Sequence, residues 1–431
     1  MNIAVIALSF LALIIAVLLN VKFQTNIGIL CAAFAFLVGG FGLSLSANSI
    51  VAFFPVAMFF QIMVVTLFFG FATQNGTMER LAEKAVYAAR NRPALIPWVM
   101  FFLGFVMTFA GAAPQGFAAV LGALAINIKK KTNMDYYLAV SMHTFGCVCG
   151  GFSPYGLFTN ISRGLLISVG GLSAAEAAPV VNKIVITSML LQFLLGVLFY
   201  IMGKGYRISK LDMEKPAAFE PGQKKSLILV VCFVLLIIVP SLLVLAIPGV
   251  KVFTNALNAV ALATIFAAIA SMMHLGNERE IIKHSIPWNL LIMVTGAALL
   301  VSVMSAAGLT ELVSGFFADS ALPKAIIPVA LCLFCAILSM FVDGTGVCMP
   351  AFIPIAFAIS TSLNIDFGLL VAAVACGVYT GGNCPISTGG ACMIMFVPEE
   401  DRSKMFYTVW LRAIPAIILA MVLIGVFSAV W

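Results

Sequence analysis

Long apolar runs fill most of this chain. Of its 431 residues, 63% are hydrophobic and only 9% are charged, and several apolar runs are near twenty residues long. About twenty apolar residues span a bilayer as one helix, and soluble domains do not concentrate such runs. The sequence therefore predicts an all-α polytopic membrane protein. The runs occupy residues 3–20, 26–45, 50–74, 94–128, 135–168, 182–203, 226–247, 255–273, 286–307, 325–362, 367–397 and 406–430.

The chain also repeats itself. Gly76 and Glu79 recur as Gly308 and Glu311 at one offset (308 − 76 = 232; 311 − 79 = 232). After a one-residue slip, an offset of 231 (377 − 146 = 231) joins a second set of residues. These are Gly146, Gly150, Gly151 and Pro154, which match Gly377, Gly381, Gly382 and Pro385. Two halves with helix-breaking residues at matching places are typical of secondary transporters.

Four of the runs are too long for one helix and are interrupted near the middle. We expect runs 94–128 and 325–362 to form re-entrant helical hairpins, and runs 135–168 and 367–397 to form crossing helices that unwind at the interruption. The breaks lie at residues 111–116, 343–346, 150–154 and 381–385, and all four contain glycine.

Lys and Arg residues predict how the spans are oriented, because short cytoplasmic loops are enriched in them. If the hairpins return and all other runs cross, most basic loops fall on one side, and the chain has ten crossings with both termini outside the cytoplasm. An odd number of crossings per half turns the second half upside down. The predicted fold is thus two inverted repeats, each with five crossings, one re-entrant hairpin and one broken helix. The repeats cover residues 1–203 and 226–431, and residues 204–225 are expected to be a cytoplasmic linker.

The four breaks form the candidate binding site. Irregular backbone at membrane depth is tolerated only where protein or a water-filled cavity satisfies it, so we expect the breaks to meet near the midplane. Half-helix N-termini direct positive dipole ends at an anion, while exposed carbonyls can hold a cation. The alternative is that the breaks only permit tight packing or kinks. Candidate side-chain ligands are Gln115, Ser153, Thr159 and Asn160 in the first half, and Thr345, Asn383, Ser387 and Thr388 in the second.

Charged residues inside a membrane are costly and are functional candidates by default. Asp343, at the tip of the second hairpin, is a candidate sodium ligand or proton carrier; its alternative role is an N-cap for the returning half-helix. His143 lies about two turns before the first unwound segment. It is a candidate for contact with a proton or with the anion, and its alternative role is that of a satisfied interior residue.

Other classes of protein fit the sequence less well. The chain has only three histidines, and His274 and His284 lie in a charged loop away from the breaks, so no catalytic or metal-ligand spacing appears. The net charge of +7 follows largely from the positive-inside bias and is not evidence for nucleic-acid binding. We therefore expect neither an enzyme nor a nucleic-acid partner, and no cofactor other than a coupling ion.

The opening third of the chain resembles a known carrier family. Residues 26–30 (Asn-Ile-Gly-Ile-Leu), 32–39 (Ala-Ala-Phe-Ala-Phe-Leu-Val-Gly), 54–55 (Phe-Pro) and 75–77 (Asn-Gly-Thr) resemble the N-terminal region of dicarboxylate carriers of the malonate-transporter (MatC) type. Those carriers belong to the ion transporter superfamily, which includes the divalent anion–sodium symporters. The whole predicted architecture is similar to that superfamily.

The resemblance implies an elevator mechanism, in which a transport domain moves against a dimeric scaffold. In the symporters, paired Ser-Asn-Thr motifs bind substrate carboxylates and help to build sodium sites. This chain has no Ser-Asn-Thr at either hairpin tip, so those sodium sites are not carried over. The Ser153-Pro154 and 385–388 stretches resemble the anion-binding breaks more closely. The implied scaffold is residues 1–74 and 226–307, and the implied transport elements are 94–203 and 325–431.

The sequence thus favours a secondary active transporter of a small dicarboxylate or related organic anion, coupled to sodium or protons. We expect a homodimer in the bacterial inner (plasma) membrane; the alternative is a sodium/proton antiporter or an inorganic-anion transporter of the same superfamily. The predicted substrate-binding residues are Ser153, Pro154, Asn160, Asn383, Pro385, Ser387 and Thr388. The predicted cation-coupling residues are Asp343, Thr345, Gly381, Gly382, Gln115 and Gly150.

Overall fold

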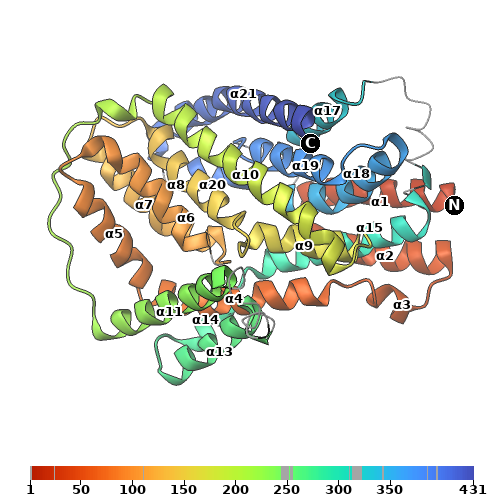
Figure 1. Ribbon diagram of the computed structural model, residues 1–431, viewed down its shortest axis with the longest axis horizontal. Helices are drawn as coiled ribbons and strands as arrows, with labels where there is room; N and C mark the ends of the chain where they lie inside the picture. Colours follow the sequence, from red (N-terminus) through yellow and green to blue (C-terminus); the bar gives the residue numbers. More distant parts are fainter. Residues whose placement is uncertain are drawn as a thin grey trace. The chain divides into compact units, whose positions relative to one another are not determined.

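The computed structural model describes residues 2–431 apart from 24, 110, 244–251, 253–255, 310, 313–322, 342–343, 386 and 395–396, and no side chains at 21, 114–120, 241–242, 388 and 391–392. Every regular element among the described residues is a helix (Figure 1). Seven of the described helices are long and apolar enough to cross a membrane. Shorter apolar helices of 10–17 residues accompany them, so the prediction of an all-α multi-pass membrane protein is confirmed. The count of ten crossings stays a prediction.

The helices gather into two compact units, and each unit collects segments that are far apart in the sequence. Unit 1 consists of Met1–Phe59, Ile161–Leu191 and Trp288–Trp431. Unit 2 consists of Phe60–Asn160 and Gln192–Pro287. Each unit therefore contains residues from both sequence repeats.

One bundle of unit 1 surrounds an apolar core that includes Cys31 and Leu300. Its helices cross closely at glycines: a Cβ added at Gly28 would overlap the backbone of Ile292, and one at Gly296 would overlap the Gly28 carbonyl. Small residues of this kind let membrane helices approach each other. The helices of this bundle are α1 (Ile3–Phe23), α2 (Ile27–Leu43), α3 (Ala47–Val51) and α15 (Trp288–Ala306).

The other part of unit 1 contains the second predicted hairpin and the second broken helix. Lys183 forms an ion pair with Asp366 (2.8 Å), and its Nζ lies 4.6 Å from the centre of the Trp431 ring. The elements are α17 (Ile326–Ser339), the π-helical turn η3 (Gly344–Cys348), α18 (Met349–Leu363), α19 (Phe367–Gly381), α20 (Thr388–Ile394) and α21 (Glu399–Val430).

Unit 2 contains the first predicted hairpin and the part of the first broken helix up to Asn160. The elements are α5 (Thr77–Ala89), η1 (Pro93–Leu95), α6 (Ile96–Phe109), α7 (Pro114–Lys130), α8 (Tyr136–Gly151), η2 (Gly205–Arg207), α11 (Pro221–Leu243), α13 (Ala259–Met272) and α14 (Glu278–His284). Three further helices contribute residues to both units: α4 (Val56–Gln74), α9 (Leu157–Ser168) and α10 (Ala174–Met202). Helix α11 begins at Pro221, inside the predicted linker, because proline is well tolerated at the first turn of a helix.

The two halves share local structure at matched positions. Gly76 and Gly308 both have positive φ angles, +74° and +99°, a backbone region that glycine adopts without strain. Asp135 and Asp366, 231 residues apart (366 − 135 = 231), both cap the broken helices: Asp135 accepts from the amide N of the third residue on at 3.3 Å, and Asp366 does so at 2.8 Å. The sequence repeat is therefore visible in the backbone and in the helix caps.

Candidate functional site: two broken helices

The first broken helix unwinds for one turn inside unit 2. Helix α8 ends at Gly151 and α9 begins at Leu157. The intervening turn is closed by backbone hydrogen bonds, among them Ser153 N to Gly150 O (2.9 Å) and Gly156 N to Ser153 O (2.9 Å). The break at residues 150–154 thus lies where the sequence predicts it.

Buried polar side chains surround this first break. Ser153 and Thr159 are fully buried, and Asn160 is 5% exposed. The Ser153 hydroxyl donates to the carbonyl of Phe109, the last residue of α6, and the Asn160 Nδ2 donates to the Tyr155 carbonyl (3.1 Å). The Ser153 hydroxyl therefore holds the end of the first hairpin helix against the unwound turn.

The second broken helix has a comparable turn in unit 1. Helix α19 ends at Gly381, and the Cys384 amide donates to the Gly381 carbonyl at 3.0 Å. Asn383 is 7% exposed and its Nδ2 donates to the Tyr379 carbonyl (3.0 Å). The Ser387 hydroxyl contacts the carbonyls of Gly382 and Cys384. The side-chain donors of this break also bind main-chain carbonyls.

The second hairpin is tied to its broken helix by a hydroxyl pair. The Thr345 hydroxyl, in the π-helical turn η3, donates to the Tyr379 hydroxyl on α19 (3.0 Å). The predicted ligand Thr345 therefore lies against the last turn of α19, beside the second break.

In each unit, a hydroxyl on the first helix of the hairpin donates to a carbonyl on the broken helix, and the two contacts lie at equivalent positions. The Thr108 Oγ1 donates to the Cys147 carbonyl (2.8 Å), and the Ser339 Oγ donates to the Val378 carbonyl (2.6 Å). The donors and the acceptors are both 231 residues apart (339 − 108 = 231; 378 − 147 = 231). The two helix pairs, α6 with α8 and α17 with α19, therefore pack alike.

The repeated glycines explain how these helix pairs come so close. A Cβ at Gly150 would overlap the Phe105 carbonyl, and a Cβ at Gly381 would overlap the Ala336 carbonyl. The same holds one turn earlier, at Gly146 and Gly377. Tight helix packing thus accounts for these glycines, which is the alternative role that the sequence analysis gives for the breaks. A cation contact at Gly150 or Gly381 stays a prediction.

The structure describes some of the remaining predicted ligands and not others. Asp343 lies outside the described residues, and the side chains of Gln115 and Thr388 are not described. Pro154 is exposed and Pro385 is buried, and each lies in the turn that interrupts its broken helix; Gly382 begins the second of these turns. His143 is 2% exposed on α8. It makes no hydrogen bond to another side chain in the described part of the chain.

The predicted ligands do not include Gln192, a buried polar residue close to this region. Gln192 lies on α10 and is fully buried, and neither atom of its amide has a hydrogen-bond partner among the described residues. Its signal in the sequence was present: it is a primary amide in the middle of the apolar run 182–203. It was overlooked because α10 contains neither glycine pair nor proline at that depth.

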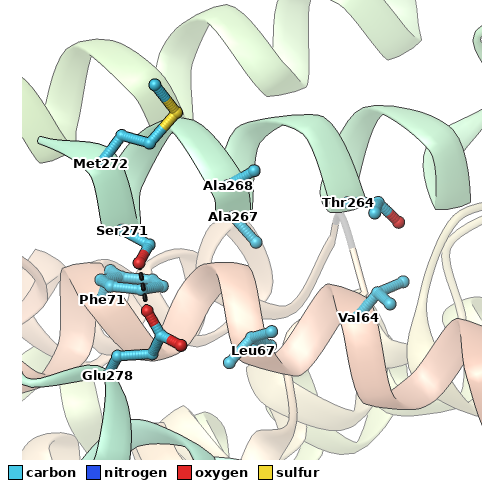
Figure 2. A pocket seen from close by; sticks show the side chains of 9 residues that line it. All are labelled: Val64, Leu67, Phe71, Thr264, Ala267, Ala268, Ser271, Met272 and Glu278. Atoms are coloured by element: carbon cyan, nitrogen blue, oxygen red, sulfur yellow. Dashed lines mark hydrogen bonds between the residues drawn. The ribbon is translucent and has the colours of Figure 1, made fainter.

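A separate cavity of 370 Å³ in unit 2 is lined by residues of α4, α13 and α14 (Figure 2). Its wall is mostly apolar, including Leu67 and Ala267, and the hydroxyl of Ser271 binds the carboxylate of Glu278 at one end. None of the predicted ligands lines this cavity.

Two family models match separate parts of the chain. Residues 1–151 match the N-terminus of the dicarboxylate carrier protein MatC, and residues 252–431 match the citrate transporter family. The comparison with curated proteins found no match. The match over residues 1–151 confirms the resemblance of the opening third of the chain to MatC-type carriers.

Solved transporter structures share the fold. The YdaH transporter of Alcanivorax borkumensis is 15% identical, with a TM-score of 0.60, and the similarity covers 96% of this chain and 98% of that one. MtrF of Neisseria gonorrhoeae, described as illuminating a class of antimetabolite efflux pumps, is 12% identical with a TM-score of 0.60, over 90% of this chain and 84% of that one. At such identities the likeness concerns the fold alone.

Family matches and fold thus agree with each other. Residues 1–151 and 252–431 are thus similar to two transporter families, MatC-type dicarboxylate carriers and citrate transporters, and the chain is a multi-pass membrane transporter for dicarboxylate- or citrate-type anions, not an enzyme.

Proposed function

We propose that this protein is a cation-coupled secondary transporter that carries a small dicarboxylate by an elevator-type alternating-access mechanism. The observation that carries the proposal is the pair of matched breaks, each ringed by buried polar side chains and each tied by a hydroxyl to a hairpin helix. Unwound helices at membrane depth are the usual location of substrate and ion sites in secondary transporters.

In the first half, we propose that the anion is held near Ser153, Pro154 and Asn160. Helix α9 begins directly after this turn, and the positive end of its dipole favours a negative charge. Burial strengthens this attraction, because fewer water molecules screen it. The two polar side chains position the turn as well as lining it, since both donate to carbonyls within it or beside it.

In the second half, we propose that Asn383, Pro385, Ser387 and Thr388 form the matching half-site. Asn383 and Ser387 lie in the turn that follows α19, where backbone carbonyls also gather. Carbonyl and hydroxyl oxygens suit a hard cation, and Thr345 brings such an oxygen from the hairpin. This half-site therefore has chemistry for both the anion and a coupling cation.

The fold-level part of the proposal follows the superfamily. Two inverted repeats of five crossings and one hairpin each, with both termini outside the cytoplasm, would supply a homodimeric scaffold from residues 1–74 and 226–307. The hairpins and broken helices would form the moving part. The sidedness is tested by labelling single cysteines introduced at Asn2 and at the 204–225 linker with a membrane-impermeant reagent, where the proposal expects opposite sides.

The deciding experiment is uptake by purified protein in liposomes. Labelled malonate, succinate and citrate are offered under separate sodium and pH gradients, with citrate included because residues 252–431 match the citrate transporter family. Accumulation driven by sodium alone supports a sodium symporter, and accumulation driven by pH alone supports proton coupling. Uptake of none of the three acids would refute the proposal and favour the antiporter or inorganic-anion alternative.

The coupling role of Asp343 has its own test. Asp343→Asn removes the negative charge while keeping the shape of the side chain, so we expect substrate uptake that no longer depends on the cation gradient. Unchanged cation dependence in the variant would contradict the assignment. If Asp343 were only a helix cap, the variant would keep its stability, because Asn is also a good N-cap.

A further inference from the structure

Gln192 is a buried polar residue that the proposed mechanism has not used. It lies near the middle of α10, among Leu190, Leu191 and Phe193, in a helix apolar enough to span a membrane. Its side chain has no exposed surface, and its Oε1 and Nε2 atoms both lack a hydrogen-bond partner in the described part of the chain. An amide buried without partners costs about 1–3 kcal/mol in mutational series. Such a group therefore calls for an explanation, such as a bound ligand or water.

The packing of α8 against α10 in unit 2 gives the depth of Gln192. The Phe199 ring contacts both Tyr137 (centroids 4.9 Å apart) and Phe145 (5.6 Å, nearly parallel). Phe199 on α10 is therefore level with residue 141 of α8, midway between Tyr137 and Phe145. A Cβ at Gly203 would lie 3.0 Å from the Leu138 side chain, so the two helices run antiparallel.

This register places Gln192 beside the first break. Gln192 precedes Phe199 by seven residues, which is two helical turns, roughly 10 Å along the axis, and returns to the same face of α10. Seven residues beyond the level of residue 141 is residue 148, in the last turn of α8 before it ends at Gly151.

Helix α6 gives the same level independently. A Cβ at Gly196 would lie 3.3 Å from the Phe101 ring, and Phe105, one turn further along α6, is the residue whose carbonyl lies against Gly150. One turn from Gly196 in the opposite direction along α10 is Gln192. Both registers therefore bring Gln192 to the level of residues 148–150.

Three donors around the first break are engaged by the protein itself, whereas the Gln192 amide, like the Thr159 hydroxyl, has no partner among the described residues. Ser153 donates its hydroxyl proton to the Phe109 carbonyl, Thr108 donates to the Gly104 and Cys147 carbonyls, and Asn160 donates to the Tyr155 carbonyl. A carboxylate accepts hydrogen bonds and cannot donate them, so it requires N–H or O–H groups that are not committed elsewhere.

We infer that Gln192 is a substrate-binding residue of the first half-site, whose Nε2 donates a hydrogen bond to a carboxylate of the transported anion. The inference rests on the proposed transport function and adds a ligand from α10, outside the hairpin and the broken helix. An amide fits this role because it offers two N–H donors without a positive charge that would have to be buried in the empty carrier.

The test compares three variants with the wild type in the same liposomes. Gln192→Met keeps the length of the side chain and removes the amide, so KM for the transported acid should rise roughly ten- to hundredfold, as for a lost hydrogen bond to a charged group. Gln192→Glu keeps the shape but places a carboxylate opposite the anion, so its uptake should fall below that of Gln192→Met. If the amide oxygen instead served the coupling cation, Gln192→Glu would retain uptake, which would overturn the inference.

Ser141→Ala is the matched control. Ser141 is also fully buried on α8 and its hydroxyl has no partner among the described residues, but it is level with Phe199, about two turns from the break. Its KM should equal that of the wild type. An equal rise in KM for Ser141→Ala and Gln192→Met would overturn the inference, because it would show a general effect of removing buried polar groups.

Thermal stability separates a ligand from a structural role. Because the amide has no partner in the described chain, Gln192→Met without substrate should unfold at the same temperature as the wild type or higher. A clear loss of stability would mean that the amide is bound within the protein, and would overturn the inference. Wild-type uptake with an unchanged KM in Gln192→Met refutes this inference alone, whereas no wild-type uptake of any of the three acids refutes the proposed function and this inference with it.

Discussion

Replacing Gly104 by alanine should force α6 and α8 apart. A Cβ at this position would lie 2.5 Å from the His143 carbonyl oxygen and 2.8 Å from the Cys147 amide nitrogen, where ordinary contact begins at 3.4 Å. The helices would have to separate locally by 0.9 Å (3.4 − 2.5 = 0.9). The obstructing atoms belong to helix backbone and cannot turn away, so we expect the cost typical of an overpacked core, about 1–3 kcal/mol or more.

The cysteines of the chain provide the assay. Of the nine free cysteines that the structure describes, only Cys232 is exposed, so a thiol-reactive fluorescent dye reports unfolding against a low background. Gly104→Ala should lower the unfolding temperature by several degrees. It should also weaken transport, because α8 ends at the first break and the Ser153 hydroxyl of that break holds the last residue of α6.

Gly40→Ala is the control for the intrinsic effect of the substitution. Nothing lies within 4 Å of a Cβ added at Gly40 in α2, and alanine is the better helix former by roughly 0.5–1 kcal/mol, so this variant should be as stable as the wild type or more so. If Gly104→Ala and Gly40→Ala shifted the unfolding temperature alike, the close approach of α6 and α8 would be refuted.

Two further predictions concern single contacts. Thr108→Val and Ser339→Ala each remove one hydroxyl that joins a hairpin helix to its broken helix, so each should lower stability by about 0.5–1.5 kcal/mol in the dye assay, and similar losses from both would support the matched roles. Asp366→Asn breaks the ion pair with Lys183 but keeps a capping oxygen for α19. The side chains of Lys183 and Asp366 are 26% and 37% exposed. The effect of the substitution should stay below about 1 kcal/mol and shrink in high salt; a large effect independent of salt would show that the pair is more than a partly exposed ion pair.

Much of the fold could be read from local patterns. Apolar runs predict membrane helices, because their length is matched to the bilayer and their backbone must be satisfied within the helix. The interruptions at 111–116, 150–154 and 381–385 coincide with helix ends, because glycine and proline act on the backbone where they stand. The offset of 231 residues appears again in the Thr108 and Ser339 hydrogen bonds.

The candidate site was less accessible from sequence. The residue types of Ser153 and Asn160 and their place at a break predict anion ligands, yet their donors bind main-chain carbonyls in the structure. Gln192 was passed over, because no local pattern distinguishes a buried amide at the level of the break from one that meets a neighbouring helix. The depth of a residue on one helix relative to another depends on side-chain packing between the two.

By itself, the sequence determined that this protein is a helical membrane transporter of two similar halves, because hydrophobic length, helix-breaking residues and a fixed repeat offset are properties of the chain read in order. Only the tertiary structure decided which hydroxyls hold each hairpin to its broken helix, which glycines are required by close backbone contact, and that Lys183 pairs with Asp366. Those features join residues far apart in the chain, and their partners are selected by packing, which no single segment encodes alone.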